Sequence, residues 1–251
     1  MTYLLRALNA ERLKLNRTLA LAMIVIAPGT VALLALMVML RSVSLNPGIE
    51  IWDTMIRNGV SLWGLLALPL FVTLETALMA GLEHSANTWK HLGALPVPRW
   101  SIYLAKYLLI MVVIAASLVA LLVLLVAVGL IIPVLLPHIT VNYGMVDWAQ
   151  ILSQLAAMYL ASWLIIAVHT WVSIRWASFT VAIGVGMAAT VANFFIINSD
   201  LAQYYPWSMP ILVTAPDPTL AANVPLILTL SIVGSVIVTL FGIVEVGRRD
   251  I

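Results

Sequence analysis

The chain has 251 residues, of which 63% are hydrophobic and only 9% are charged, and its mean hydropathy is +1.11. A soluble domain averages about 25% charged residues, so these few charges could not cover a water-exposed surface, and the composition excludes a soluble globular protein. The formal net charge of +2 is uninformative by itself, and the absence of cysteine excludes disulfides and thiolate metal sites.

The first segment in chain order is amphipathic. Residues 3–17, YLLRALNAERLKLNR, carry leucines that can share one helical face and four cations that lie elsewhere. This pattern predicts an interfacial helix over residues 1–18 that lies on the inner leaflet. A basic flank that only sets the orientation of the chain is the alternative.

Six apolar windows follow, each long enough to cross a bilayer core as a helix of about 20 residues. They predict an all-α integral membrane protein with a single transmembrane domain over residues 1–251. The expected spans are at about 19–40, 59–81, 104–132, 149–171, 177–197 and 223–246.

The lysine and arginine residues fix the expected orientation, because they concentrate on the cytoplasmic side of membrane proteins. Six spans with both termini inside leave only Arg41 and Arg57 outside. The cations on the inner side are then Arg6, Arg12, Lys14, Arg17, Lys90, Arg99, Lys106, Arg175, Arg248 and Arg249.

The second span contains the ionisable residue Glu75, and an ionisable group inside a span is a functional candidate by default. Three interpretations stay open: an ion pair with Lys106 or Arg175, a side chain that reaches the inner interface, and direct contact with a substrate. Asn193 and Asn198 in the fifth span suit hydrogen bonds between helices.

The segment 82–103, which follows the second span, is the largest inner loop between spans. Its first half, LEHSANTWKHLGAL, places apolar residues at helical spacing, and Pro96 and Pro98 end that helix. We therefore expect a short helix that lies across the membrane surface and exposes Trp89, a surface suited to docking another protein. A helix that lies on lipid without a partner is the alternative.

The longest outer segment, 198–222, lacks lysine and arginine and contains three aromatic residues that suit the outer membrane interface. They are Tyr204, Tyr205 and Trp207.

No catalytic or metal-binding pattern is present. The sequence contains neither GxxxxGK(S/T) nor HExxH, so it lacks the phosphate-binding loop of nucleotide hydrolases and the zinc motif of metalloproteases. His84 and His91 are too far apart along one helix to share a metal. Ser162 and His169 share a span, but nothing around them matches a known catalytic turn.

The stretch GLEHSANTWKHLGALPVPRWSIYLAK resembles the first cytoplasmic loop of ABC-2 type transporter permeases, the type V exporter-like class. The resemblance is to the branch of lantibiotic-immunity and bacitracin-type peptide exporters. The opening helix, the segment YYPWSMP at 204–210 and the six-span plan with both termini inside are similar too, so the resemblance covers nearly the whole chain.

The resemblance implies a non-catalytic permease in a bacterial plasma membrane. A second identical or homologous permease and two ATPase subunits would complete the transporter, with ATP and magnesium on the ATPases, membrane lipid around the spans and no nucleic acid. Residues 83–93 would be the coupling helix that docks in the ATPase, and the docking candidates are Glu83, His84, Asn87, Trp89 and Lys90.

Because the path would be almost uncharged, we expect export of an amphipathic substrate, and a peptide antibiotic is the preferred candidate. Two alternatives stay open: a stand-alone secondary transporter or channel that uses Glu75, and an intramembrane enzyme.

Overall fold

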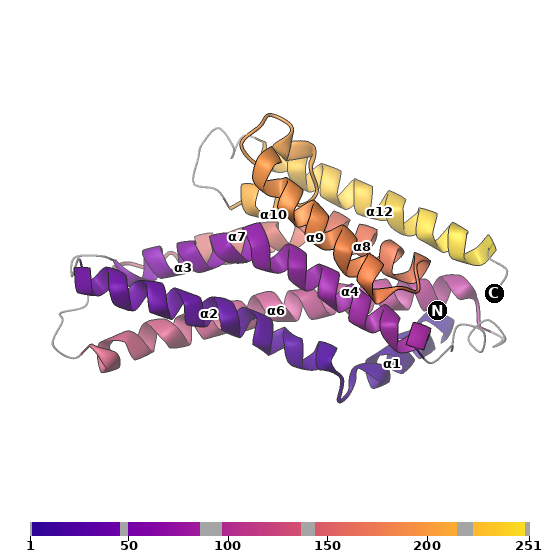
Figure 1. The fold of residues 1–251 in the computed structure, drawn as a ribbon, viewed down its shortest axis with the longest axis horizontal. Helices are drawn as coiled ribbons and strands as arrows, with labels where there is room; N and C mark the ends of the chain where they lie inside the picture. The colour runs from indigo at the N-terminus through magenta and orange to yellow at the C-terminus, as the bar shows by residue number, and fades with distance from the viewer. Residues whose placement is uncertain (1, 46–49, 86–96, 137–143, 215–222, 249–251) are drawn as a thin grey trace.

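The computed structural model describes residues 2–45, 50–85, 97–136, 144–214 and 223–248, and the secondary structure in these ranges is helical (Figure 1). The longer helices lie side by side in an elongated bundle. In chain order the helices are α1 (Thr2–Leu15), α2 (Leu19–Leu45), α3 (Ile51–Leu62), α4 (Leu68–Ser85), α6 (Arg99–Leu135), α7 (Trp148–Ala161), α8 (Trp163–Arg175), α9 (Phe179–Ile196), α10 (Met209–Leu212) and α12 (Val224–Arg248).

Within the described ranges, six helical segments are long and apolar enough to cross a membrane, which confirms the predicted number of spans. Two of these segments are each made of two helices. The second joins α3 to α4, and the fourth joins α7 to α8. The segments are Leu19–Val43, Ile51–His84, Arg99–Leu135, Trp148–Arg175, Phe179–Ile196 and Val224–Arg248.

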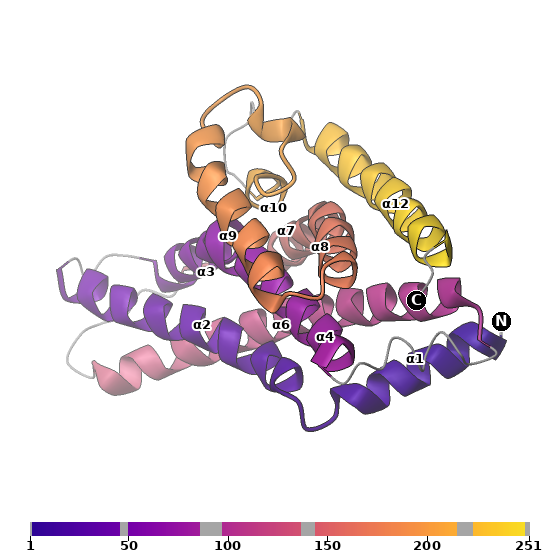
Figure 2. The same cartoon turned by 45° about the vertical axis from the view of Figure 1, so that its right-hand side comes forward.

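Both chain ends lie at the same end of the bundle, as expected for an even number of crossings (Figures 1 and 2). We call this the terminal end and the opposite one the distal end. Helix α1 is joined to α2 by a sharp turn at Arg17, whose φ of 62° is in the left-handed region. Part of the predicted leucine stripe of α1 packs against protein rather than lipid, since Leu15 is buried and α1 lies along α6.

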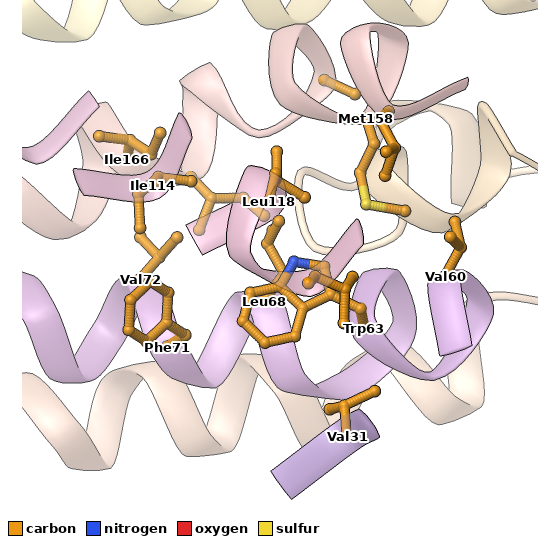
Figure 3. Packing of buried hydrophobic residues seen from close by; sticks show 14 of the residues in the cluster. Val31, Val60, Trp63, Leu68, Phe71, Val72, Ile114, Leu118, Met158 and Ile166 are labelled. Atoms are coloured by element: carbon orange, nitrogen blue, oxygen red, sulfur yellow. The ribbon is translucent and has the colours of Figure 1, made fainter. Parts of the chain in front are cut away.

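The hydrophobic core surrounds the second span, which packs against α2 and α6 and, through α4, against α8 and α9 (Figures 1 and 3). Trp63 is fully buried at its centre, and its ring lies 5.7 Å from that of Phe71. Ile114 and Leu118 of α6 and Met158 of α7 pack around the same helix (Figure 3). The second span is therefore covered by protein, whereas α2, α9 and α12 keep apolar side chains exposed for lipid.

The second and fourth spans are both irregular near their middle. Trp63–Ala67 form a π-helical turn (η1) between α3 and α4, and a single residue, Ser162, separates the end of α7 from the beginning of α8. The π turn packs against the last turn of α7, since a Cβ on Gly64 would come within 2.8 Å of the Met158 methyl carbon. π-Helical turns of this kind occur frequently at functional sites.

Ser231 of α12 satisfies the backbone at the break between α7 and α8. Its hydroxyl oxygen lies 2.8 Å from the carbonyl oxygen of Leu160 and 3.0 Å from that of Ala161, and it accepts from the Leu164 N–H at 3.3 Å. In a membrane such groups must find partners within the protein. The last helix therefore supplies the polar contacts that the fourth span cannot make for itself.

Helices α4 and α9 approach so closely that a side chain at Gly186 has no room. A Cβ added there would lie 2.1 Å from Thr73 Oγ1, and this hydroxyl is fixed by its bond to the Pro69 carbonyl oxygen.

We expect Gly186→Ala to push the helices apart and to lower the free energy of unfolding by about 1–3 kcal/mol, measured by thermal unfolding in detergent. Gly184→Ala is the control on the same helix, because a Cβ there meets nothing within 4 Å; equal losses in the two variants would contradict the packing.

Candidate functional site

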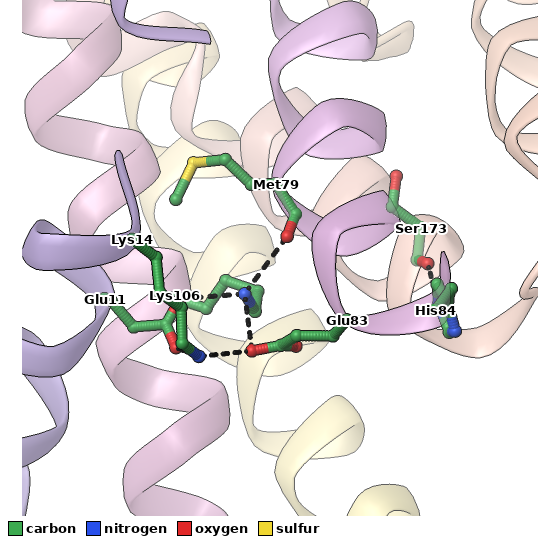
Figure 4. A network of polar contacts seen from close by, with 7 residues as sticks. All are labelled: Glu11, Lys14, Met79, Glu83, His84, Lys106 and Ser173. Atoms are coloured by element: carbon green, nitrogen blue, oxygen red, sulfur yellow. Dashed lines mark hydrogen bonds and ion pairs between the residues drawn. The ribbon is translucent and has the colours of Figure 1, made fainter. Parts of the chain in front are cut away.

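Four charged side chains form a cluster at the terminal end, which we call the inner ion cluster: Glu11, Lys14, Glu83 and Lys106 (Figure 4). The Lys14 side chain is 34% exposed, and the other three are buried. Lys106 Nζ lies 2.8 Å from Glu11 Oε2 and 3.3 Å from Glu83 Oε1, and Lys14 Nζ lies 2.6 Å from Glu83 Oε1. Lys14 also contacts Glu11. The cluster contains two carboxylates and two ammonium groups, so its charges balance.

Three different elements contribute to the inner ion cluster. Glu11 and Lys14 lie one turn apart on α1, Glu83 belongs to the last turn of α4, and Lys106 lies near the beginning of α6. Lys106 also donates to the Met79 carbonyl oxygen at 3.3 Å, one turn before Glu83 on α4. The cluster therefore fixes α1 and the end of the second span to the beginning of the third.

The electrostatics of the cluster keep Glu11 and Lys14 oppositely charged. Burial alone would raise the pKa of Glu11, but Lys106 and Lys14 outweigh this effect and hold it below its ordinary value. Burial would lower the pKa of Lys14, but Glu83 and Glu11 raise it instead. The stabilisation from Glu11 is therefore present above the ordinary carboxylate pKa and is lost only as the pH falls through the depressed one.

The structure places two of the five predicted docking residues. Helix α4 continues without a break to Ser85, so Glu83 and His84 extend the second span. Glu83 points into the inner ion cluster rather than outward, because two lysines provide the partners that a buried carboxylate needs. His84 is half-buried, and its Nε2 donates to the Ser173 carbonyl oxygen of α8 at 3.0 Å (Figure 4).

The other three docking candidates, Asn87, Trp89 and Lys90, lie outside the described residues, as does most of the predicted coupling helix. Their role stays a prediction.

A second ion pair fixes the fourth span to the sixth at the same end. Arg175 Nε lies 2.8 Å from Glu245 Oε1, and Glu245 also accepts from the Trp171 indole N–H. The Arg175 guanidinium lies 5.5 Å from the ring centre of Trp176. The terminal end is thus held by charged contacts on both sides of the bundle.

Glu75 is fully buried, and neither of its carboxyl oxygens has a hydrogen-bond partner among the described residues. The predicted ion pair is wrong, because Lys106 binds Glu11 and Glu83 while Arg175 binds Glu245. The side chain does not reach the surface of the chain either. Contact with a substrate stays a prediction.

The aromatic residues of the distal segment do not form a single interfacial belt. Tyr204 is exposed, as a belt residue should be, but Trp207 is buried and its ring lies 5.5 Å from that of His169. Tyr205 donates to the Ala189 carbonyl oxygen at 2.7 Å, and Ser208 donates to Asn193 Oδ1 at 2.6 Å. The segment 202–214 therefore folds back into the bundle, because its apolar residues Met209, Pro210 and Leu212 are buried there.

The side chains proposed for the enzyme alternative are not paired. Ser162 donates to the Tyr159 carbonyl oxygen at 2.6 Å, whereas His169 Nε2 lies 3.3 Å from Thr73 Oγ1. Within the described ranges no group of three metal-ligating side chains is found.

A pocket of about 510 Å³ opens at the distal end between α3 and α7, beside Val213 and Thr214. Sequence reasoning missed it because its walls come from three separate segments. The only available signal was the position of Asp53, Arg57 and Asp147 next to span ends.

Comparison with known families gives one match: the model described as "ABC-2 family transporter protein" covers residues 7–193, well over half of the chain. No curated protein matches the chain.

Removing one charged side chain from the inner ion cluster should destabilise the protein. We expect Lys106→Met to lower the free energy of unfolding by about 3–5 kcal/mol, because Glu11 and Glu83 would then share one lysine, measured by thermal unfolding in detergent. Arg57→Gln is the control, since its pair with Asp53 is exposed and is worth no more than about 1 kcal/mol. If the two variants lost the same stability, the cluster would not hold these helices together.

Proposed function

The chain belongs to the ABC-2 family of transporters, and we propose that it is moved by separate ATPases to export an amphipathic substrate. As an ABC-2 permease it is a transmembrane, non-catalytic subunit of an ABC transporter, and this family works with an ABC ATPase.

In the orientation that we propose, the terminal end faces the cytoplasm. Ten of the 12 lysine and arginine residues then lie on the inner side, as the distribution of cations in membrane proteins requires. The inner ion cluster and the pair Arg175–Glu245 lie at that end. An ATPase would approach the bundle there.

The observation that carries the coupling proposal is the place of Glu83. It lies in the last described turns of α4, directly before the segment 86–96, and it is joined by lysines to α1 and α6. A displacement of that segment by an ATPase would act on α4 first. Through the cluster it would also act on α1 and α6, so three elements would shift together.

We propose that the coupling segment is 82–103 and that Asn87, Trp89 and Lys90 contact the ATPase. Two ATPase copies with ATP and magnesium would serve a pair of permeases, the second either identical or homologous, in a bacterial plasma membrane.

A bacitracin-type or lantibiotic peptide is the cargo we favour, because the spans offer few charges and a large apolar surface. Antibiotic resistance would follow from its export.

A second candidate function rests on Glu75. Glu75 is fully buried and has no hydrogen-bond partner among the described residues, and carboxyl groups inside spans often belong to proton relays. In this alternative the chain alone would move its substrate along a gradient, as a secondary transporter or a channel.

The coupling proposal predicts that Trp89→Ala lowers ATP-driven export of bacitracin about tenfold or more in the complex with its ATPase, because buried aromatic anchors commonly contribute 2 kcal/mol or more. Export would be measured in vesicles. Trp100→Ala is the matched control, since Trp100 is exposed at the start of α6, beyond the prolines that end the predicted docking helix. Unchanged export in the Trp89 variant would refute the docking role.

The two candidate functions differ in their need for ATP. If the chain acts as an ABC permease, Glu75→Gln should leave export dependent on ATP, and vesicles that contain the purified chain alone should transport nothing. Gradient-driven transport by the chain alone, abolished by Glu75→Gln, would instead establish the secondary transporter. Flux measured with and without the ATPase separates these outcomes.

A further inference from the structure

Apolar side chains form the floor of the distal pocket, and charged side chains form its rim. The floor contains the buried apolar residues Ile56, Val60 and Val213, whereas Asp53, Arg57 and Asp147 are exposed at the rim. Its volume of about 510 Å³ is within the range of about 300–1,000 Å³ that small-molecule sites occupy. Such a pocket suits a ligand with an apolar body and one polar group.

The charges at the rim favour a cation. Arg57 is already neutralised, because its Nη2 lies 2.6 and 2.7 Å from the two carboxylate oxygens of Asp53. Asp147 accepts only from a neutral group, the Gln150 N–H, through Oδ1 at 3.0 Å. Among the described residues no cation lies within ion-pair distance of Asp147.

A second carboxylate lies close to this edge of the pocket. Gly144 has a φ of 64°, which turns the chain just before Met145, and a Cβ there would come within 2.9 Å of Glu50 Oε2. The turn therefore holds Glu50 near the segment that carries Asp147. Because the charges of Asp53 and Arg57 cancel, the carboxylates of Asp147 and Glu50 leave the mouth of the pocket negatively charged.

Aromatic surface completes the site. Trp52 lines the pocket, and its ring lies 6.3 Å from that of Trp148 at the beginning of α7. Indole faces attract organic cations, and they also accept apolar groups.

We propose that the distal pocket binds a monovalent lipophilic cation, with its charge near Asp147 and its apolar body on the floor formed by Ile56, Val60 and Val213. That the pocket opens to the outside rests on the proposed orientation, and it would then hold an exported cationic amphipath before release. The binding itself depends only on the pocket.

The test measures equilibrium binding to the full-length chain in lipid nanodiscs, with empty nanodiscs subtracted. Tetraphenylphosphonium is the probe, and tetraphenylborate has nearly the same shape and the opposite charge. We expect saturable binding of the phosphonium and none of the borate. Asp147→Asn should weaken phosphonium binding about tenfold, while the fold is kept because asparagine is an equally good helix cap.

Two further variants make the result specific. Asp200→Asn removes the same charge at the distal end without lining the pocket, and it should leave the affinity within about twofold. Arg57→Gln frees Asp53 and should tighten phosphonium binding about threefold or more, a gain that misfolding cannot produce. Equal effects of Asp147→Asn and Asp200→Asn, or equal binding of the two probes, would overturn the proposal.

This test does not depend on transport. Binding that follows the expected pattern supports the site even if the complex exports nothing, which would refute the proposed function alone. Export of bacitracin without specific phosphonium binding would support the function and refute the site.

Discussion

The charged contacts among Glu11, Lys14, Glu83 and Lys106 are the constraint on which the terminal end of this protein depends. Taking the charges of Glu11, Glu83 and Lys106 out of water is costly, and the cost is offset only where every group has close partners of opposite sign. The arrangement across α1, α4 and α6 meets this requirement. It also means that a shift of α4 alone would leave Glu83 unpaired and a shift of α6 alone would leave Lys106 unpaired, whereas α1 carries both Glu11 and Lys14.

In the distal half of the bundle, by contrast, the contacts are mostly apolar and the helices are interrupted. The π turn at Trp63–Ala67 and the break after Ala161 separate α3 and α7 from the helices that continue them to the terminal end. The segment 202–214 fills the space beside these irregularities. The ion-paired terminal end thus adjoins a distal end where, among the described residues, no ion pair joins two helices.

The number of spans could be predicted from the sequence because 20-residue apolar windows are set by bilayer thickness alone. The partners of individual polar residues could not. Glu83 lies in an amphipathic pattern that suits docking, and only the three-dimensional position of Lys14, 69 residues earlier in the chain, turns it inward. One of the three interpretations of Glu75 was an ion pair with Lys106 or Arg175, but both cations pair with other carboxylates.

The sequence pattern also could not predict that residues 202–214 fold back into the bundle. Tyr205 and Trp207 have the composition of an interfacial belt, and their burial depends on space left between α8 and α9 by other helices. The same holds for the distal pocket, whose walls meet only in the folded chain. Local periodicity determines the helices, whereas cavities and ion pairs depend on how those helices pack.

The contact made by Ser231 has a consequence for biogenesis. The carbonyl groups of Leu160 and Ala161 lie in the middle of a crossing and contact a hydroxyl that is synthesised about 70 residues later. Until the last helix enters the membrane, these groups have no partner from it, and exposing them to lipid costs several kcal/mol. We therefore expect the fourth span, α7 and α8, to stay beside the insertion machinery or in a straighter conformation until the sixth span, α12, is inserted.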